Sequence, residues 1–357
     1  AFHTSLKIAN ESPLLVLAGI SGTGKSALPR LYAEGMGLHF LNVAVQPSWD
    51  SPMDMLGFFN HLEGRYKATE LSRALAQMDR YGARNGRWPE RDGNQYVGLQ
   101  DRMLLVLLDE MNLARVEYYF SEFLSKLEVR RDIDPGNDEQ RRKSEILLET
   151  GASPGSQQSM RLYAGTNVLF VGTMNEDEST QTLSDKVVDR ANVLRFGMPA
   201  DLKLREQGQR PQGTSQFVQY ETWQRWLRTD QALDGGQRDQ VEKFIRDCNK
   251  ALEKIGKPFA YRTANAIRAY VGNYPRLDRE QWLNHALSDQ IEQRVLPKLR
   301  GVDAQEDAGR GAINMVQKVV TQLDDGVLGK AIQSGADSGQ GHQFIWRGID
   351  RATEVVV

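Results

Sequence analysis

Eight residues near the start of the chain have the spacing of a phosphate-binding loop. The segment GISGTGKS, residues 19–26, fits the pattern G-x-x-x-x-G-K-[ST]. In such a loop the glycines let backbone N–H groups turn toward phosphate oxygens, the lysine reaches the β and γ phosphates, and the hydroxyl ligates Mg²⁺. The pattern predicts a nucleoside-triphosphate site with Mg²⁺. Its candidate binding residues are Gly19, Ser21, Gly22, Thr23, Gly24, Lys25, Ser26 and Ala27.

A pair of carboxylates farther along the chain supplies the second part of this chemistry. The apolar run MLLVLL, residues 103–108, is followed directly by Asp109 and Glu110. Acids at the carboxyl tip of a parallel strand lie where ligands bind. We expect Asp109 to hold the Mg²⁺ together with Ser26, and Glu110 to polarise the attacking water as a catalytic residue. A strand-end acid that only caps the next helix is the alternative.

Such a site needs a parallel sheet whose strands end beside the loop. Five short apolar runs have the profile of buried parallel strands, at residues 14–18, 39–45, 103–108, 168–172 and 193–196. Helical patterns follow both the loop and the acid pair, and from residue 217 onward only helical periodicity remains. This order predicts an α/β fold, with a P-loop core built on a parallel sheet and a small all-α lid domain after it.

The order of strand and helix patterns also divides the chain into three parts. We expect an α/β nucleotide-binding core over residues 1–200, a helical lid over 201–300, and a carboxyl-terminal extension over 301–357 whose structure the sequence does not predict. The core carries two insertions, at about 46–100 and about 130–165.

Each insertion has its own pattern. The first contains one helical stretch, at about residues 70–80, and a polar loop. The second is expected to form a hairpin with arms at 145–149 and 160–164. An acid-rich loop in the second insertion is flanked by Arg130 and Arg131 on one side and by Arg141, Arg142 and Lys143 on the other. We expect these side chains to be solvated or to face a pore.

Net charge, cysteine content and the length of apolar runs exclude some kinds of binding and structure. The 357 residues include 45 Lys and Arg against 47 Asp and Glu, a formal net charge of -2, so overall charge gives no reason to expect nucleic-acid or membrane binding. Cys248 is the only cysteine, which excludes an intrachain disulfide and favours a reducing, cytoplasmic location. No apolar run approaches the ~18 residues that a membrane span needs. The chain starts without Met, in a stretch that reads as an amphipathic helix, so we expect it to be part of a longer protein.

The chain resembles an AAA+ NTPase of the branch that contains McrB-type restriction motors, MoxR-like chaperones and dynein. The resemblance covers about residues 10–300 and rests on several blocks in the same order. Beyond the two motifs above, these blocks are QPSWDSPMDMLGFFN (46–60), MNLARVEYYFSEFLSKLE (111–128), VGTMNEDEST (171–180), LSDKVVDRANVLRF (183–196), FAYRTANAI (259–267) and QIEQRVLPKLRG (290–301). The two insertions match those that this branch carries in its second helix and before its fourth strand.

The resemblance implies roles for further residues. Asn175 resembles the sensor that aligns the attacking water with the γ-phosphate. Arg190 resembles the arginine finger, which serves the nucleotide of the neighbouring subunit, and Arg262 resembles the lid arginine that senses nucleotide. With Glu110, these three complete the catalytic candidates. Weaker candidates are Arg195 as a second finger, and Asn112 and Arg115 as residues that transmit the nucleotide state across the interface.

The resemblance also implies partners. A finger that serves a neighbour requires a ring of identical subunits, expected to be a hexamer. McrB-like proteins imply a motor that drives a separate nuclease in restriction or antiphage defence, with DNA met in the pore or through an upstream domain. A MoxR-type protein-remodelling chaperone is the alternative. GTP-using McrB proteins carry MNxxDRS, whereas this chain has Glu178 and Ser179 at the positions of that Asp and Arg, so we favour ATP over GTP.

Overall fold

The structure is a computed structural model of the whole chain. It describes residues 1–81, 99–149, 159–176, 183–197, 213–214, 216–229, 232–277, 280–337 and 342–349. The predicted core–lid boundary near residue 200 lies outside the described residues, as do Glu178 and Ser179. The domain limits therefore remain predictions.

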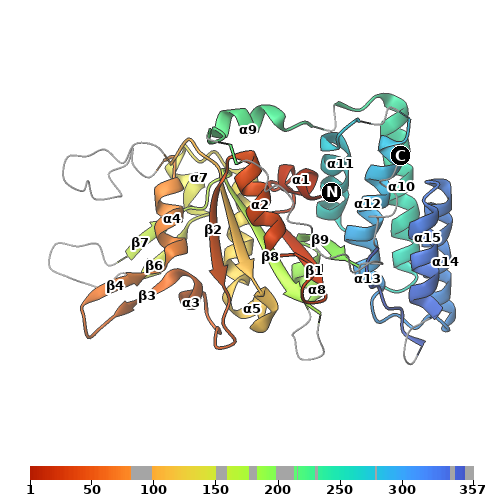
Figure 1. Cartoon of the computed structure of the whole chain (residues 1–357), viewed down its shortest axis with the longest axis horizontal. Coiled ribbons are helices and arrows are strands. Elements are labelled where there is room, and N and C mark those ends of the chain that lie inside the picture. The colour runs from red at the N-terminus through yellow and green to blue at the C-terminus, as the bar shows by residue number, and fades with distance from the viewer. Residues whose placement is uncertain are drawn as a thin grey trace.

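A five-stranded parallel sheet forms the centre of the molecule (Figure 1). Its strands, in the order β2-β5-β8-β1-β9, are β1 (Leu14–Gly19), β2 (His39–Ala44), β5 (Leu104–Asp109), β8 (Val168–Asn175) and β9 (Ala191–Phe196). All five correspond to predicted runs, so the α/β fold with a parallel sheet is confirmed. The chain passes from β1 to β2 at the far edge of the sheet. In the sheet, β1 lies between β8 and β9. Ligands of open α/β sheets bind outside the carboxyl ends of the strands, where the strand order reverses.

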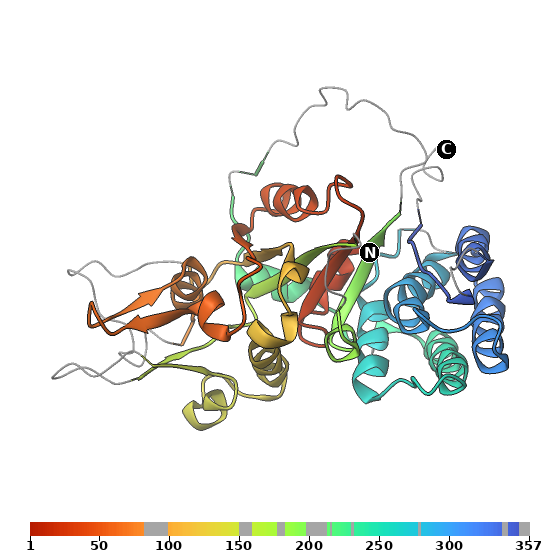
Figure 2. The same ribbon diagram turned by 90° about the horizontal axis from the view of Figure 1, so that it is seen from below.

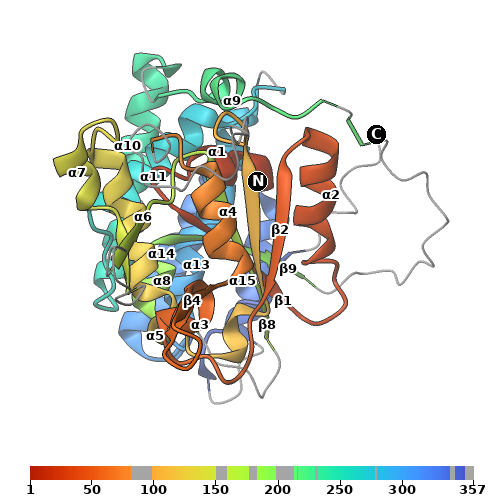
Figure 3. The same cartoon turned by 90° about the vertical axis from the view of Figure 1, so that its left-hand side faces the viewer.

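Alternate residues of the central strands enter two different apolar cores, as a strand period of two requires. Leu14 and Val16 pack into one core, with α4 (Glu70–Met78) and α6 (Ser121–Val129). Leu15 and Leu17 pack into the other; it is covered by α1 (Phe2–Lys7), α2 (Ala27–Met36) and α9 (Tyr220–Trp226). Figure 3 shows α2 and α4 on opposite sides of the sheet. Because the strands are covered on both faces, only their ends can accept a ligand.

The register brings the carboxyl ends of the inner strands to one level. Gly19 of β1 pairs with Asn175 of β8, and Leu108 of β5 pairs with Gly172 of β8. Asp109 therefore lies beside Thr173, close to the start of the phosphate loop. The amino ends are equally aligned, because Leu14 pairs with the first residue of β9.

Two hairpins extend from the core on the side away from the carboxyl-terminal helices (Figures 1 and 2). The predicted one pairs β6 (Ile146–Glu149) with β7 (Ser159–Leu162). The other was not predicted; in it β3 (Gly57–Asn60) pairs with β4 (Arg65–Ala68). The remaining elements of this side are α3 (Pro52–Leu56), α5 (Val116–Tyr119) and α7 (Asp138–Arg142). The helical stretch predicted after the acid pair is divided at Phe120, between α5 and α6.

Two arginines of the second insertion are buried, against the prediction of solvated side chains. Arg141 is fully buried and forms ion pairs with Asp79 and Glu145, the latter at 2.7 Å. Arg130 is also buried, and one of its guanidinium nitrogens donates to the backbone carbonyl of Gly165 at 2.8 Å. Arg141 therefore joins the second insertion to the first, and Arg130 holds the second insertion against the start of β8, instead of facing solvent.

In the carboxyl-terminal part, a single apolar cluster joins the helical elements. They are α10 (Gly235–Glu253), α11 (Tyr261–Asn273), α12 (Trp282–Gln290), a π-helical turn (Ile291–Val295), α13 (Leu296–Leu299), α14 (Asp307–Gln322) and α15 (Gly326–Asp337). The helices α14 and α15 lie within residues 301–357, for which no structure was predicted from the sequence. A Cβ on Gly335 of α15 would approach the carbonyl of Ile345 to 2.6 Å, so close packing requires glycine at this position. None of the described helices is long and apolar enough to cross a bilayer.

Candidate nucleotide-binding site

The predicted phosphate loop connects β1 to α2 and has the backbone shape that an anion site requires. Gly22 and Gly24 have φ of 83° and 84°, a left-handed conformation that L side chains rarely adopt. Gly19 is also constrained, because a Cβ there would approach the carbonyl of Phe196 to 2.6 Å. Within the described part of the chain, the backbone N–H groups of residues 21–24 donate to no carbonyl. With the amino end of α2 they form a cradle of donors suited to phosphate oxygens.

The Lys25 ammonium folds back over this loop. It is only 5% exposed, and it donates to the Ile20 carbonyl at 2.5 Å and to the Thr23 hydroxyl at 3.4 Å. These partners are neutral oxygens of the loop itself. Phosphate oxygens in the cradle would offer stronger, charge-assisted hydrogen bonds to the same ammonium.

The two candidate magnesium ligands meet at the ends of β1 and β5. The Ser26 hydroxyl donates to Oδ1 of Asp109 at 2.7 Å, and the Thr173 hydroxyl donates to the same oxygen at 2.6 Å. Mg²⁺ is bound through one or two protein oxygens together with phosphate oxygens and water. The described residues contain no group of three or more His, Cys, Asp or Glu that could hold a metal alone. Ser26 and Asp109 therefore fit an ion that is shared with a nucleotide.

Glu110 has an unusual backbone conformation beside this pair. Its φ of 54° places a non-glycine residue in the left-handed region, which costs about 1–2 kcal/mol. Its backbone N–H donates to the Thr173 hydroxyl at 2.8 Å, and its carboxylate accepts from the Asn175 amide at 3.1 Å. Asn112 in turn donates to the Asn175 carbonyl at 2.7 Å. The carboxylate of Glu110 is thus held beside the amide of Asn175, as a water-activating pair requires.

Arg190 lies at the opposite end of the sheet from this loop. It immediately precedes β9, whose first residue pairs with Leu14, and its carbonyl accepts from the Ser12 hydroxyl at 3.2 Å. The phosphate loop begins five residues beyond Leu14. At about 3.3 Å per residue this separation is about 16 Å along the strand, farther than an arginine side chain reaches. The Arg190 side chain therefore does not reach the phosphate loop of its own subunit.

Arg262 lies close to Arg190, and not beside the phosphate loop. It is the second residue of α11, and its Nε is 3.1 Å from Oε1 of Glu128, near the end of α6. The other carboxylate oxygen of Glu128 is 3.5 Å from a terminal nitrogen of Arg190. The Glu128 carboxylate therefore lies between Arg190 and Arg262. The sequence analysis did not single out Glu128.

Arg195 is held inside its own subunit. Only 9% of its side chain is exposed; it pairs with Glu176 at 2.6 Å and also donates to the Trp346 carbonyl. Burial lowers the pKa of its guanidinium. These contacts do not suit a second finger. Arg115 is exposed and donates to the Tyr118 hydroxyl at 3.0 Å.

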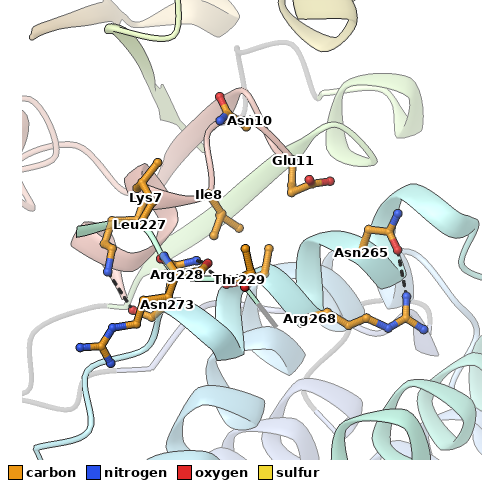
Figure 4. Close-up of a pocket in the computed structure, with 11 residues that line it drawn as sticks. Lys7, Ile8, Asn10, Glu11, Leu227, Arg228, Thr229, Asn265, Arg268 and Asn273 are labelled. Carbon is orange, nitrogen blue, oxygen red and sulfur yellow. Dashed lines mark hydrogen bonds between the residues drawn. The ribbon is translucent and has the colours of Figure 1, made fainter. Parts of the chain in front are cut away.

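A cavity of about 380 Å³ lies near the amino end of β1 (Figure 4). It is lined from three directions: by the segment around Ile8, by the chain before α10 around Thr229, and by α11. Figure 4 shows the Lys7 ammonium directed to the carbonyl of Asn273, 3.4 Å away. Because it precedes β1, whereas the phosphate loop follows that strand, this cavity is separate from the candidate triphosphate site.

Comparison with known proteins gives little independent information. Residues 215–333 match the family model of a domain of unknown function (DUF8727), which is less than half of the chain. No curated protein matches the sequence significantly. Among solved structures, a protein from Cytophaga hutchinsonii described as a "putative ATPase" is similar over 89% of this chain and 88% of its own, with 13% identity and a TM-score of 0.48. A similarity this low does not establish a shared activity, so the functional argument depends on the site itself.

Proposed function

We propose that this chain is the AAA+ module of an NTP-hydrolysing motor that works as a ring with Mg²⁺ and prefers ATP to GTP. The observation that carries the proposal is the hydrogen-bonded series Ser26–Asp109–Thr173–Glu110–Asn175 beside the phosphate loop. These side chains come from three separate strand ends or loops and meet only in the folded chain.

The roles follow from the chemistry of each group. The loop N–H groups and Lys25 bind the phosphates, while Ser26 and Asp109 hold the metal, which when bound neutralises charge on the β and γ phosphates. Glu110 accepts a proton from the attacking water, and the Asn175 amide, 3.1 Å from that carboxylate, fixes its orientation.

The position of Arg190 supports an assembly. Since this side chain does not reach the phosphate loop of its own subunit, a role in transition-state stabilisation requires a second copy of the chain. Repeated head to tail, such a contact forms a ring when the rotation between copies closes, and this is the assembly we propose. Arg262 lies beside Arg190, so we assign it to the same neighbouring site.

The work done by the motor is inferred from the McrB-like sequence blocks. They favour a restriction or antiphage motor that drives a separate nuclease, over a MoxR-type chaperone that remodels a protein. The near-zero net charge of -2 fits a chain in which any contact with DNA is limited to a few residues or made by another domain.

Nucleotide turnover with ATP and with GTP, with and without DNA, tests the proposal. We expect Mg²⁺-dependent hydrolysis that EDTA and Lys25→Ala both abolish. Stimulation by DNA favours the restriction motor, and indifference to DNA favours the chaperone. Absence of turnover in an assembled, nucleotide-bound protein would contradict a hydrolytic function.

A further inference from the structure

We propose that Glu128 is a positioning residue that holds Arg190 and Arg262 together as one unit for the nucleotide of a neighbouring subunit. This inference rests on the proposed function, since it concerns the residues assigned to act between subunits. It gives a role to a carboxylate outside both sequence motifs.

The contacts show how one side chain controls two arginines. Glu128 is 16% exposed, and its two oxygens face different partners: Oε1 lies 3.1 Å from Arg262 Nε, and Oε2 lies 3.5 Å from Arg190. The Arg190 nitrogen near Oε2 also donates to the Ser125 hydroxyl at 2.9 Å, one turn earlier on α6. Three separate parts of the chain meet here: α6, the segment before β9, and α11.

Charge explains why a carboxylate is needed at this position. Two guanidinium groups side by side repel each other, and a shared anion between them offsets that repulsion. Arg190 is 27% exposed and Arg262 is 44% exposed, so both remain accessible to a second molecule. Without the negative charge of Glu128, we expect the two side chains to separate and to lose the geometry that a transferring phosphoryl group requires.

A purely structural role for Glu128 makes a different prediction. An ion pair that only fastens α11 to α6 would affect thermal stability or assembly, and hydrolysis only as a result. A positioning role lowers the kcat of the neighbouring subunit, while KM, melting temperature and ring size stay unchanged.

Mixed assemblies separate the two roles. The receiving subunit carries Arg190→Ala and keeps an intact nucleotide site. The donor carries Glu110→Gln, which removes its own hydrolysis and leaves its arginines in place. Turnover then occurs only where a donor arginine meets a receiving site. The tested donor adds Glu128→Gln, and the matched control donor adds Glu122→Gln, an exposed glutamate on the same helix.

We expect the Glu110→Gln donor and its Glu122→Gln version to restore turnover equally, and the Glu128→Gln version to support about 10²-fold less, as for a misplaced catalytic group. Equal turnover with both double-variant donors overturns the positioning role and leaves action between subunits intact. No restoration by the simple donor overturns the proposed function itself. Sedimentation checks assembly, and a Glu128→Gln donor that fails to enter mixed rings overturns the proposal in favour of an assembly role.

Discussion

At the scale of single residues, Thr173 is the centre of the candidate site. It belongs to β8 and is 2% exposed, and its hydroxyl contacts both members of the acid pair: it donates to Asp109 and accepts from the backbone of Glu110. The second bond is made to a residue with a left-handed backbone, which needs support from its surroundings. Thr173 thus couples Asp109, the proposed metal ligand, to Glu110, the proposed general base.

Replacement of Thr173 by valine keeps the shape of the side chain and removes both hydrogen bonds. Because the Glu110 N–H, which is part-buried, loses its acceptor, we expect the free energy of unfolding to fall by about 1 kcal/mol. We also expect lower kcat, since Glu110 loses its support. Denaturant unfolding and steady-state kinetics measure the two effects. Thr173→Ser, which keeps the hydroxyl, should lose much less, and wild-type kcat in Thr173→Val would argue against this role.

Glu110→Gln separates nucleotide binding from hydrolysis. The amide keeps the size of the side chain but accepts a proton poorly, so turnover should fall by about 10²–10⁴-fold, the range for a lost general base. Affinity for the nucleotide should change little, because the phosphate cradle is intact. Equilibrium binding and single-turnover hydrolysis measure the two quantities. Turnover near the wild-type rate would refute Glu110 as the base.

At the scale of elements, the sequence predicted what depends on local pattern. The five strands of the parallel sheet and the position of the phosphate loop were predicted because buried parallel strands and a glycine-rich loop have local signatures. The hairpin of β3 and β4 was missed because Gly57–Asn60 does not alternate between apolar and polar residues, although Arg65–Ala68 does. The burial of Arg141 was missed for another reason. Its partner Asp79 lies 62 positions away, so no local pattern indicates the pairing.

Arg141 provides a test at this scale, because it joins three elements. It lies in α7 and contacts Asp79 after α4 and Glu145 before β6. Arg141→Leu would leave two buried carboxylates without their cation, so we expect a loss of about 3–5 kcal/mol in unfolding free energy. Arg142→Leu, at an exposed position of the same helix, is the control and should change stability by less than about 0.5 kcal/mol. Equal unfolding midpoints for the two variants would show that the buried pairs do not hold the insertion.

At the scale of the whole molecule, the proposed function and the separation of Arg190 from its own loop together predict an activity that depends on assembly. We expect turnover per subunit to rise with protein concentration and to level off once rings form. Arg190→Ala should stay slow at every concentration, by about 10³–10⁵-fold, the range for a missing arginine finger. Turnover assays combined with sedimentation measure both. Constant turnover per subunit down to concentrations at which the protein is monomeric would contradict the requirement for a neighbour.

The strand β9 gives such a ring a direction. Its carboxyl end, Phe196, pairs with Gly19 at the start of the phosphate loop, and its amino end follows Arg190 directly. In a closed ring of identical copies every β9 therefore has the same orientation. Its amino end lies at Arg190, which we propose acts on a neighbouring subunit, and its carboxyl end lies at the phosphate loop of its own subunit. A subunit with a defective arginine silences the neighbour on one side and spares the one on the other. In such a ring each subunit therefore depends on the neighbour on one side only.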